Sequence, residues 1–248
     1  MSEGKSRFAS AGLWLGVIAL AVLVLSILGN RLELVHFGIA VRGMALAALI
    51  GIIAVFVSAA GVILTFVTKR TGLRTAIAGL LLGVLVAAPV VQSIMVGAKV
   101  PRIHDITTDL DNPPAFEAAI AARGENSNPL DRAAPDLAEL QRQAYPDLVT
   151  LKVSEHPGKV FEAALATAKA QGWEILAADP ARGTIEAVAV TRVMNFKDDV
   201  AIRITETADG TAVDVRSVSR VGESDLGANA NRIRTYLHAL KMNLAEAG

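Results

Sequence analysis

Three long apolar runs fill the first hundred positions of the chain, and shorter amphipathic patterns begin after position 148. The apolar runs cover residues 11–29, 43–68 and 75–98, and none contains Asp, Glu, Lys, Arg or His. A helix of about 20 apolar residues crosses the ~30 Å hydrocarbon core of a bilayer, where backbone groups must be hydrogen-bonded within the segment. The pattern therefore predicts three transmembrane helices.

A cleaved secretion signal is the alternative interpretation of the first run, because such signals begin with positive residues and Lys5 and Arg7 precede the run. The run is longer than the apolar part of such a signal, no A-x-A cleavage site follows, and two more spans come after it. We therefore expect the first run to be a retained span.

Charges in the short loops favour one orientation, because Lys and Arg are enriched on the cytoplasmic side of membranes. With the N-terminus in the cytoplasm, the inner charges are Lys5, Arg7, Lys69, Arg70 and Arg74, and the outer ones are Arg31, Arg42, Lys99 and Arg102. This predicts a multi-pass protein of the inner (cytoplasmic) membrane with residues 99–248 outside, which in a Gram-negative cell is the periplasm.

Small residues recur at four-residue spacing in each run and favour close helix packing. They are Gly12 and Gly16, then Gly43, Ala47 and Gly51, then Thr75, Gly79, Gly83 and Ala87. We expect a three-helix bundle, with an oligomer contact as the alternative use of the same ridges. Transport by the bundle alone is not expected, because the spans contain no ionisable residue.

A loop-rich linker is predicted at residues 99–147, where six of the nine prolines lie. A short helix is expected at 135–144. Apolar residues indicate that the linker packs on the domain that follows; they are Phe116, Leu130, Leu137, Leu140 and Tyr145.

The pattern of residues 148–248 predicts an α+β domain. Strands are expected at 149–154, 173–178, 184–191, 198–206 and 211–219, and helices at 157–171 and 225–244. The apolar stripe of the last helix is Leu226, Ala230, Ile233, Leu237, Leu240 and Leu244. The order β-α-β-β-β-β-α indicates an antiparallel sheet with both helices on one face.

The apolar residues of the last hairpin limit its register. Val200, Ile202 and Ile204 of one strand and Val213 and Val215 of the other face the same core only if the numbers of directly paired residues sum to an odd value. A two-residue turn at Asp209-Gly210 sets Arg203 opposite Arg216, whereas a four-residue loop sets Arg203 opposite Asp214. Like charges directly opposed are unfavourable. In both registers these three charged residues lie on the face away from the core.

The polar stretch at residues 216–237 contains the candidate site. Ser224 and Asp225 are expected to begin the last helix. An anion or partner could bind at that N-terminus through Arg203, Arg216, Arg220, Ser224 and Asn229. Alternatively, acids of the same chain occupy the arginines and join the linker to the domain; the candidates are Asp105, Asp109, Asp198 and Asp199. Asn229 is interpreted as linking neighbouring segments, with ligand binding as the alternative.

Three segments carry a family resemblance: HDITTDLDNPPAF (104–116), NFKDDVAIRI (195–204) and RSVSRVGESDLGANANRIRTYL (216–237). In this order they resemble the domain of unknown function family numbered 1499, over about residues 102–244, in a membrane-anchored form. The resemblance implies a membrane-attached bacterial protein and no established activity. Many members carry Asn-Cys where this chain has Asn112-Pro113-Pro114, so any role of that cysteine is absent here.

Composition narrows the functional classes. The chain has no cysteine, and its 24 basic and 24 acidic residues form no dense basic face, which argues against nucleic-acid binding. No metal or cofactor and no catalytic residue is predicted, because the four histidines lie apart. We predict a non-enzymatic envelope protein whose outer domain binds a protein, lipid or cell-wall partner. The alternatives are an enzyme acting on an anionic envelope substrate and a structural subunit of a membrane complex.

Overall fold

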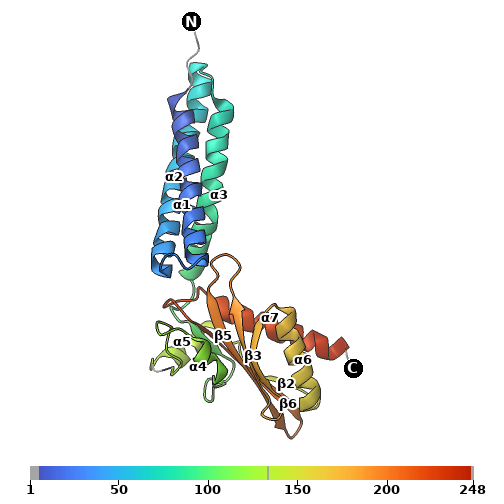
Figure 1. Ribbon diagram of the computed structural model, residues 1–248. Coiled ribbons are helices and arrows are strands. Elements are labelled where there is room, and N and C mark those ends of the chain that lie inside the picture. The colour runs from blue at the N-terminus through green and yellow to red at the C-terminus, as the bar shows by residue number, and fades with distance from the viewer. Residues whose placement is uncertain (1–5, 133, 247–248) are drawn as a thin grey trace. The chain divides into compact units, whose positions relative to one another are not determined.

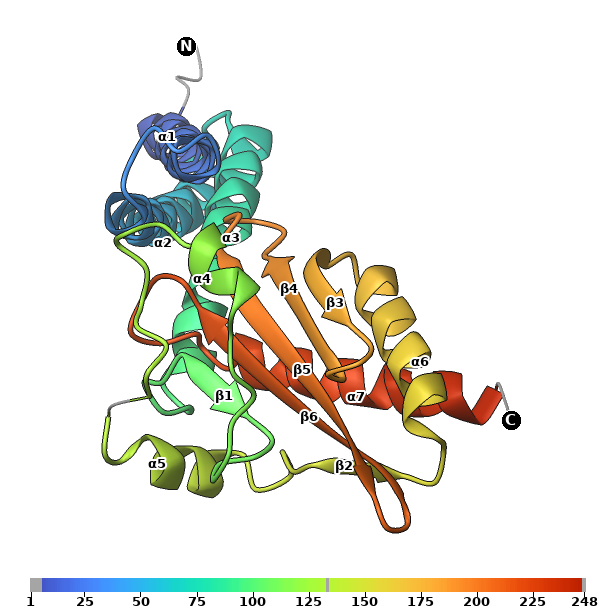
Figure 2. The ribbon, with the colours of Figure 1, turned by 60° about the horizontal axis from the view of Figure 1, so that its bottom comes forward.

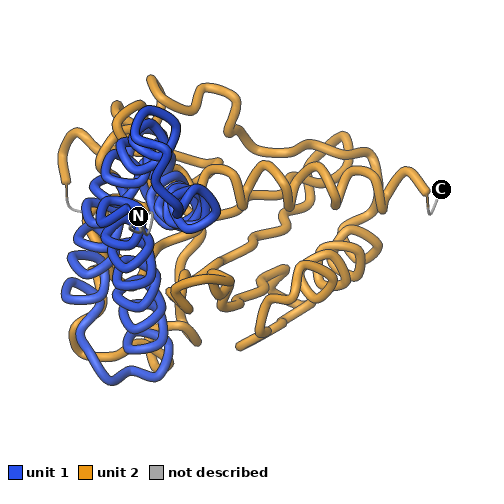
Figure 3. Tube along the Cα trace, turned by 90° about the horizontal axis from the view of Figure 1, so that it is seen from above, with its two compact units in different colours: residues 1–96 blue, residues 97–248 orange. Residues whose placement is uncertain are grey.

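The chain forms two compact units, residues 1–96 and 97–248, in a computed structural model that describes residues 6–132 and 134–246 (Figure 3). The first unit is helical, with α1 (Arg7–Arg31), α2 (Phe37–Thr68) and α3 (Leu73–Gly97) side by side (Figure 1). All three helices are long and apolar enough to cross a membrane, as predicted.

Close contacts between small residues hold the three helices together. A Cβ atom added at Gly79 of α3 would lie 2.6 Å from the backbone nitrogen of Leu13 in α1 and 2.5 Å from Oγ of Ser58 in α2. A Cβ atom at Gly51 would lie 3.0 Å from the carbonyl oxygen of Gly83. These glycines therefore serve packing within the bundle, and an oligomer contact stays a prediction.

The second unit contains a six-stranded antiparallel sheet, which confirms the predicted fold class (Figure 2). Its strands are β1 (Asp105–Thr107), β2 (Leu151–Val153), β3 (Glu174–Asp179), β4 (Thr184–Val190), β5 (Lys197–Thr207) and β6 (Gly210–Ser219). The order is β1-β6-β5-β4-β3, and β2 also pairs with β6. Strands β1 and β2 thus cover different parts of one edge of β6. Strand β1 lies in the predicted linker and was not expected, because three residues are too few to show an alternating pattern.

Helices cover both faces of the sheet. Helices α6 (Pro157–Ala170) and α7 (Ala228–Glu246) pack on one face, over a core that includes Val200, Ile202, Val213 and Val215. The short helix α4 (Ala118–Ala122) lies on the opposite face, against Ala201 and Val218. Helix α5 (Leu137–Ala144) contributes Leu137 to the main core. The linker therefore forms part of the folded domain.

The β5–β6 hairpin has the register that places unlike charges opposite each other. Arg203 pairs with Asp214 across the ladder, and its Nη2 lies 2.9 Å from Oδ2 of that aspartate. The hairpin closes on Ala208 and Asp209, since Thr207 pairs with Gly210. Both expected loops were therefore wrong, because the turn has two residues but lies one position earlier than Asp209-Gly210; the register that pairs Arg203 with Asp214 is confirmed. Gly210 has φ +137°, and a Cβ there would collide with the carbonyl oxygen of Val153.

Helix α7 begins at Ala228, three residues later than predicted. Leu226 and Gly227 have φ values of +53° and +82°, which are incompatible with an α-helix. The carboxylate of Asp225 accepts hydrogen bonds of 2.8 Å from the backbone nitrogens of Gly227 and Asn229, whereas Ser224 Oγ accepts only from Leu226. Leu226 is half exposed, and Tyr236 is a fully buried residue of the helix that the predicted stripe omitted.

Candidate functional site

The sheet face opposite α6 and α7 carries buried ion pairs that involve the linker. Asp105 of β1 accepts hydrogen bonds from Arg216 Nε (3.1 Å) and Nη2 (2.7 Å) and from Arg132 Nη1 (2.6 Å). Arg216 also donates to the carbonyl oxygens of Pro114 and Leu130. Its side chain is only 6% exposed. Two guanidinium groups therefore share one buried carboxylate.

A second group of two arginines and one aspartate is centred on β5, where Asp199 binds both Arg123 and Arg220. Arg123 also donates to the carbonyl oxygen of Asn128, and Arg220 to that of Ala122. These bonds join residues 122–128 of the linker to the sheet.

Arg203 contacts two carboxylates, Asp109 at 2.8 Å and Asp214 at 2.9 Å. Burial raises the pKa of Asp109, but hydrogen bonds from the backbone of Asn112 and from Arg203 outweigh it, so the pKa lies below its ordinary value. Asp214 also accepts hydrogen bonds from the hydroxyls of Thr108 and Thr150. Asp214 thereby joins the linker, through Thr108, and the segment before β2, through Thr150, to the sheet.

The structure distributes the predicted anion-binding residues among separate contacts. Arg203, Arg216 and Arg220 each have an aspartate partner, and Ser224 belongs to the turn before α7. Asp105 and Asp109 of the linker bind arginines of the sheet, as the ion-pair alternative describes. Asp198 binds Arg232 of α7, which had not been singled out, and Asp199 binds Arg220 and Arg123. Binding of an external anion by the predicted group stays a prediction.

Asn229 lies on the α7 side of the sheet and is fully buried. Its Oδ1 accepts from Ser217 Oγ (2.7 Å) and from Arg232, and its Nδ2 donates to the carbonyl oxygen of His104 (3.0 Å) and to Ser219 Oγ (2.9 Å). All four hydrogen-bonding positions of the amide are used. The side chain thus links α7, β6 and the linker.

Replacing Asn229 by Ala is expected to lower the free energy of unfolding by about 2–3 kcal/mol, because several buried polar groups lose their partner. The measurement is urea unfolding of the full chain in mild detergent. Asn231→Ala on the exposed side of α7 is the matched control and should leave stability unchanged or slightly raised, since Ala favours helix. Equal losses for the two variants would contradict the assigned role.

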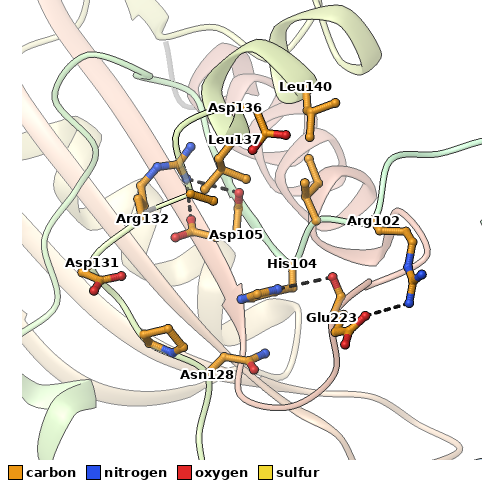
Figure 4. Close-up of a pocket in the computed structure, with 13 residues that line it drawn as sticks. Arg102, His104, Asp105, Asn128, Asp131, Arg132, Asp136, Leu137, Leu140 and Glu223 are labelled. Atoms are coloured by element: carbon orange, nitrogen blue, oxygen red, sulfur yellow. Dashed lines mark hydrogen bonds and ion pairs between the residues drawn. The ribbon is translucent and has the colours of Figure 1, made fainter.

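A cavity of about 370 Å³ opens where the start of the linker meets α5 (Figure 4). Ile103, Pro129, Leu137 and Leu140 supply apolar walls. The polar lining comes from Arg102, His104, Asp105, Asn128, Asp131, Arg132, Asp136 and Glu223. Although polar residues are the more numerous, most of the exposed lining surface is apolar, as in small-molecule sites of proteins.

Contacts at the edge of the cavity are solvent-exposed. Arg102 Nη2 lies 2.7 Å from Glu223 Oε2, and both side chains are about four-fifths exposed. The ring nitrogen Nδ1 of His104 lies 3.4 Å from the carbonyl oxygen of Glu223. In the described ranges, no group of three or more His, Asp or Glu side chains is arranged to hold a metal ion.

Arg132 is the residue that the sequence did not reveal. Its Nη1 binds the side chain and the carbonyl oxygen of Asp105, while Nη2 is buried without a hydrogen-bond partner. Its backbone has φ +51°, which is uncommon outside glycine. Burial lowers the pKa of this guanidinium, Asp105 opposes that effect and Arg216 adds to it. Nothing in the surrounding sequence distinguishes this arginine from a solvated one.

A second cavity of about 480 Å³ adjoins the first and shares Asp131, Arg132, Ala134 and Leu137 with it. Arg216 and several apolar residues of the linker complete its lining. Arg132 therefore lies at the boundary of two cavities.

The family described as "Protein of unknown function (DUF1499)" matches residues 105–240. No curated protein matches the chain. The matched range covers more than half of the chain and contains the sheet with its buried ion pairs. The chain therefore belongs to the DUF1499 family, in a form with three helices able to span a membrane ahead of the domain.

Proposed function

We propose that this protein is a non-enzymatic binding protein of the bacterial inner membrane, with its C-terminal domain in the periplasm. The bias of positive loop charges supports this orientation. The partner is a small molecule or the exposed part of an envelope lipid, cell-wall fragment or protein, and it binds at the 370 Å³ cavity.

The observation that carries the proposal is this cavity together with the buried ion pairs beside it, in which Asp105 binds Arg132 and Arg216. The sheet arginines at positions 203, 216 and 220 are each held by an aspartate, and none of them lines this cavity. Asp105, the partner of Arg216, and Arg132 form part of its wall instead. The arrangement favours a binding site over an enzyme with an arginine-rich centre. That alternative would need these arginines and Asn229 to face one pocket, whereas Asn229 lies on the other side of the sheet.

Blocking the cavity tests the proposal. Ala134→Trp places a large ring where the two cavities meet. Ile120→Trp on α4 is the control, because Ile120 is exposed and lines neither cavity. The full chain is purified from native membranes, and bound lipids, small molecules and proteins are identified by native mass spectrometry.

We expect a molecule that accompanies the parent protein and Ile120→Trp and is lost from Ala134→Trp. The proposal fails if all three proteins carry the same set of molecules. A protein partner that remains bound to Ala134→Trp would instead favour a structural subunit of a membrane complex.

A further inference from the structure

We infer that the cavity takes a singly charged oxyanion, a carboxylate or a phosphodiester, attached to an apolar group, and that Arg132 is its partner. The inference rests on the proposed function and names the ligand class of the same site.

The first argument is an unused hydrogen-bond donor. Among the described residues, four buried side-chain atoms lack a partner: Ser58 Oγ, Arg132 Nη2, Tyr145 Oη and Gln171 Nε2. Only the arginine nitrogen belongs to a charged group. Buried donors are rarely left unpaired, and one of a charged group is especially costly, so an external acceptor would satisfy it.

The second argument is charge. The group of Arg132, Asp105 and Arg216 has two positive charges and one negative charge, and all three side chains are nearly buried. The charged neighbours that act on Arg132 are Asp105 and Arg216. Within this buried group the excess is one positive charge in surroundings of low dielectric, which favours one negative charge placed directly against Arg132. Elsewhere on the cavity lining, acids outnumber Arg102, so the attraction is confined to Arg132.

The comparable group on β5 shows why the site lies at Arg132. Arg123 and Arg220 also share one aspartate, but each donates in addition to a linker carbonyl oxygen. Neither has a buried nitrogen without a partner among the described residues. An anion therefore gains a new hydrogen bond at Arg132 and would have to displace existing ones at the other group.

The remaining lining limits the ligand. Asp131, Asp136 and Glu223 also line the 370 Å³ cavity and oppose a second negative charge, so a phosphate monoester is disfavoured. Ile103, Pro129, Leu137 and Leu140 favour an apolar group beside the anion. Arg132 Nη2 is shielded from solvent, so the ligand oxygen must replace the atoms that now cover it.

Two sources supply such a group: soluble carboxylates with an apolar chain, and lipids with a phosphodiester headgroup. A lipid source is reasonable because Arg102, at the edge of the cavity, follows the last residue of α3, Gly97, in the chain by only five positions. The experiment distinguishes the two sources.

Binding of hexanoate, hexanol and inorganic phosphate to the full chain is measured by calorimetry in uncharged detergent. Hexanol has the same apolar chain without the charge, and phosphate is the anion without the chain. The variants are Arg132→Gln, Arg132→Lys and Arg182→Gln. Arg182 is the control because its removal changes the net charge equally, at an exposed pair with Glu117 that lines neither cavity.

We expect hexanoate to bind the parent and Arg182→Gln with equal affinity. Its affinity for Arg132→Gln should be at least about tenfold lower, because a charge-assisted hydrogen bond is lost. The hexanoate affinity of Arg132→Lys should lie between those of the parent and Arg132→Gln. A lysine keeps the charge, but its single ammonium group cannot bind Asp105 with one nitrogen and the ligand with another. Hexanol and phosphate should bind more weakly than hexanoate. Arg132→Gln should remain folded, since Asp105 keeps Arg216, and equal urea midpoints would show this.

The protein in lipid nanodiscs identifies the source. Weaker hexanoate binding in phosphatidylglycerol discs than in discs of an uncharged glycolipid, which has no phosphodiester, indicates a lipid headgroup. Equal binding in the two kinds of disc indicates a soluble carboxylate, and each result supports the inference. Equal hexanoate affinity of Arg132→Gln and the parent overturns it, as does tighter binding of phosphate than of hexanoate. If Ala134→Trp loses a native ligand but hexanoate binds to no variant, the inference fails and the proposed function stands.

Discussion

Replacing Asp105 by Ala is expected to lower the free energy of unfolding of the C-terminal domain by about 3–5 kcal/mol. The change leaves Arg132 and Arg216 buried without their shared carboxylate, and breaking one side of a buried ion pair carries a cost of this size. The loss should exceed that of most single substitutions, because two buried positive charges then also repel each other.

Urea unfolding of the full chain in mild detergent measures this effect. In a Trp14→Phe background, which removes the tryptophan of α1, the fluorescence of Trp173 reports on the domain, because its ring stacks on Tyr236 at a centroid distance of 5.0 Å. Glu117→Ala removes the acid of an exposed pair with Arg182 and should leave the midpoint unchanged. Adding Arg132→Gln to Asp105→Ala should recover part of the loss, since one unpaired charge is removed. A midpoint of Asp105→Ala equal to that of the parent would show that the ion pairs do not stabilise the fold.

Replacing Gly79 by Leu should disrupt the helix bundle, at a cost of about 3 kcal/mol or more. A side chain at this position meets backbone atoms of Gly12 and Leu13 at 2.7 and 2.6 Å, so no rotamer change relieves the clash. The helices must separate locally and lose the close packing that holds them together in lipid.

An engineered disulfide provides the measurement, because the chain has no cysteine of its own. Ser26→Cys and Gly43→Cys join α1 and α2, since a Cβ at Gly43 lies 3.2 Å from Cβ of Ser26. The SDS concentration that prevents formation of this bond should fall when Gly79→Leu is added. Val84→Leu, at a half-exposed position of α3, is the control and should cause no change. An unchanged SDS threshold for Gly79→Leu would contradict the packing role.

Local and periodic features were predictable. The spans follow from composition alone, because hydrocarbon requires a helix from any long apolar run. The regular strands β3 to β6 and helix α6 follow from patterns of period 2 and 3.6. The register that pairs Arg203 with Asp214 was also accessible, since it needs only the apolar faces and the sign of opposed charges.

Short elements and helix ends were less predictable. Strand β1 has three residues, and its strand character comes from pairing with β6 and from Gln141, whose side chain bonds both the nitrogen and the carbonyl oxygen of Thr107. At the start of α7, the sequence indicates a helix at Ser224 and Asp225. The backbone instead turns at Leu226 and Gly227, and the Asp225 nitrogen donates to the carbonyl oxygen of Ile103.

The sequence by itself determined the membrane helices, the α+β architecture and the presence of arginines and aspartates able to pair, because these depend on residue type and spacing along the chain. Only the tertiary structure decided which charges meet. Asp105 and Arg216 are 111 residues apart, and Arg132 acquires its buried, unpaired nitrogen only when the linker folds onto the sheet. The physical reason is that burial and partner choice are properties of the folded surroundings, which no local pattern contains.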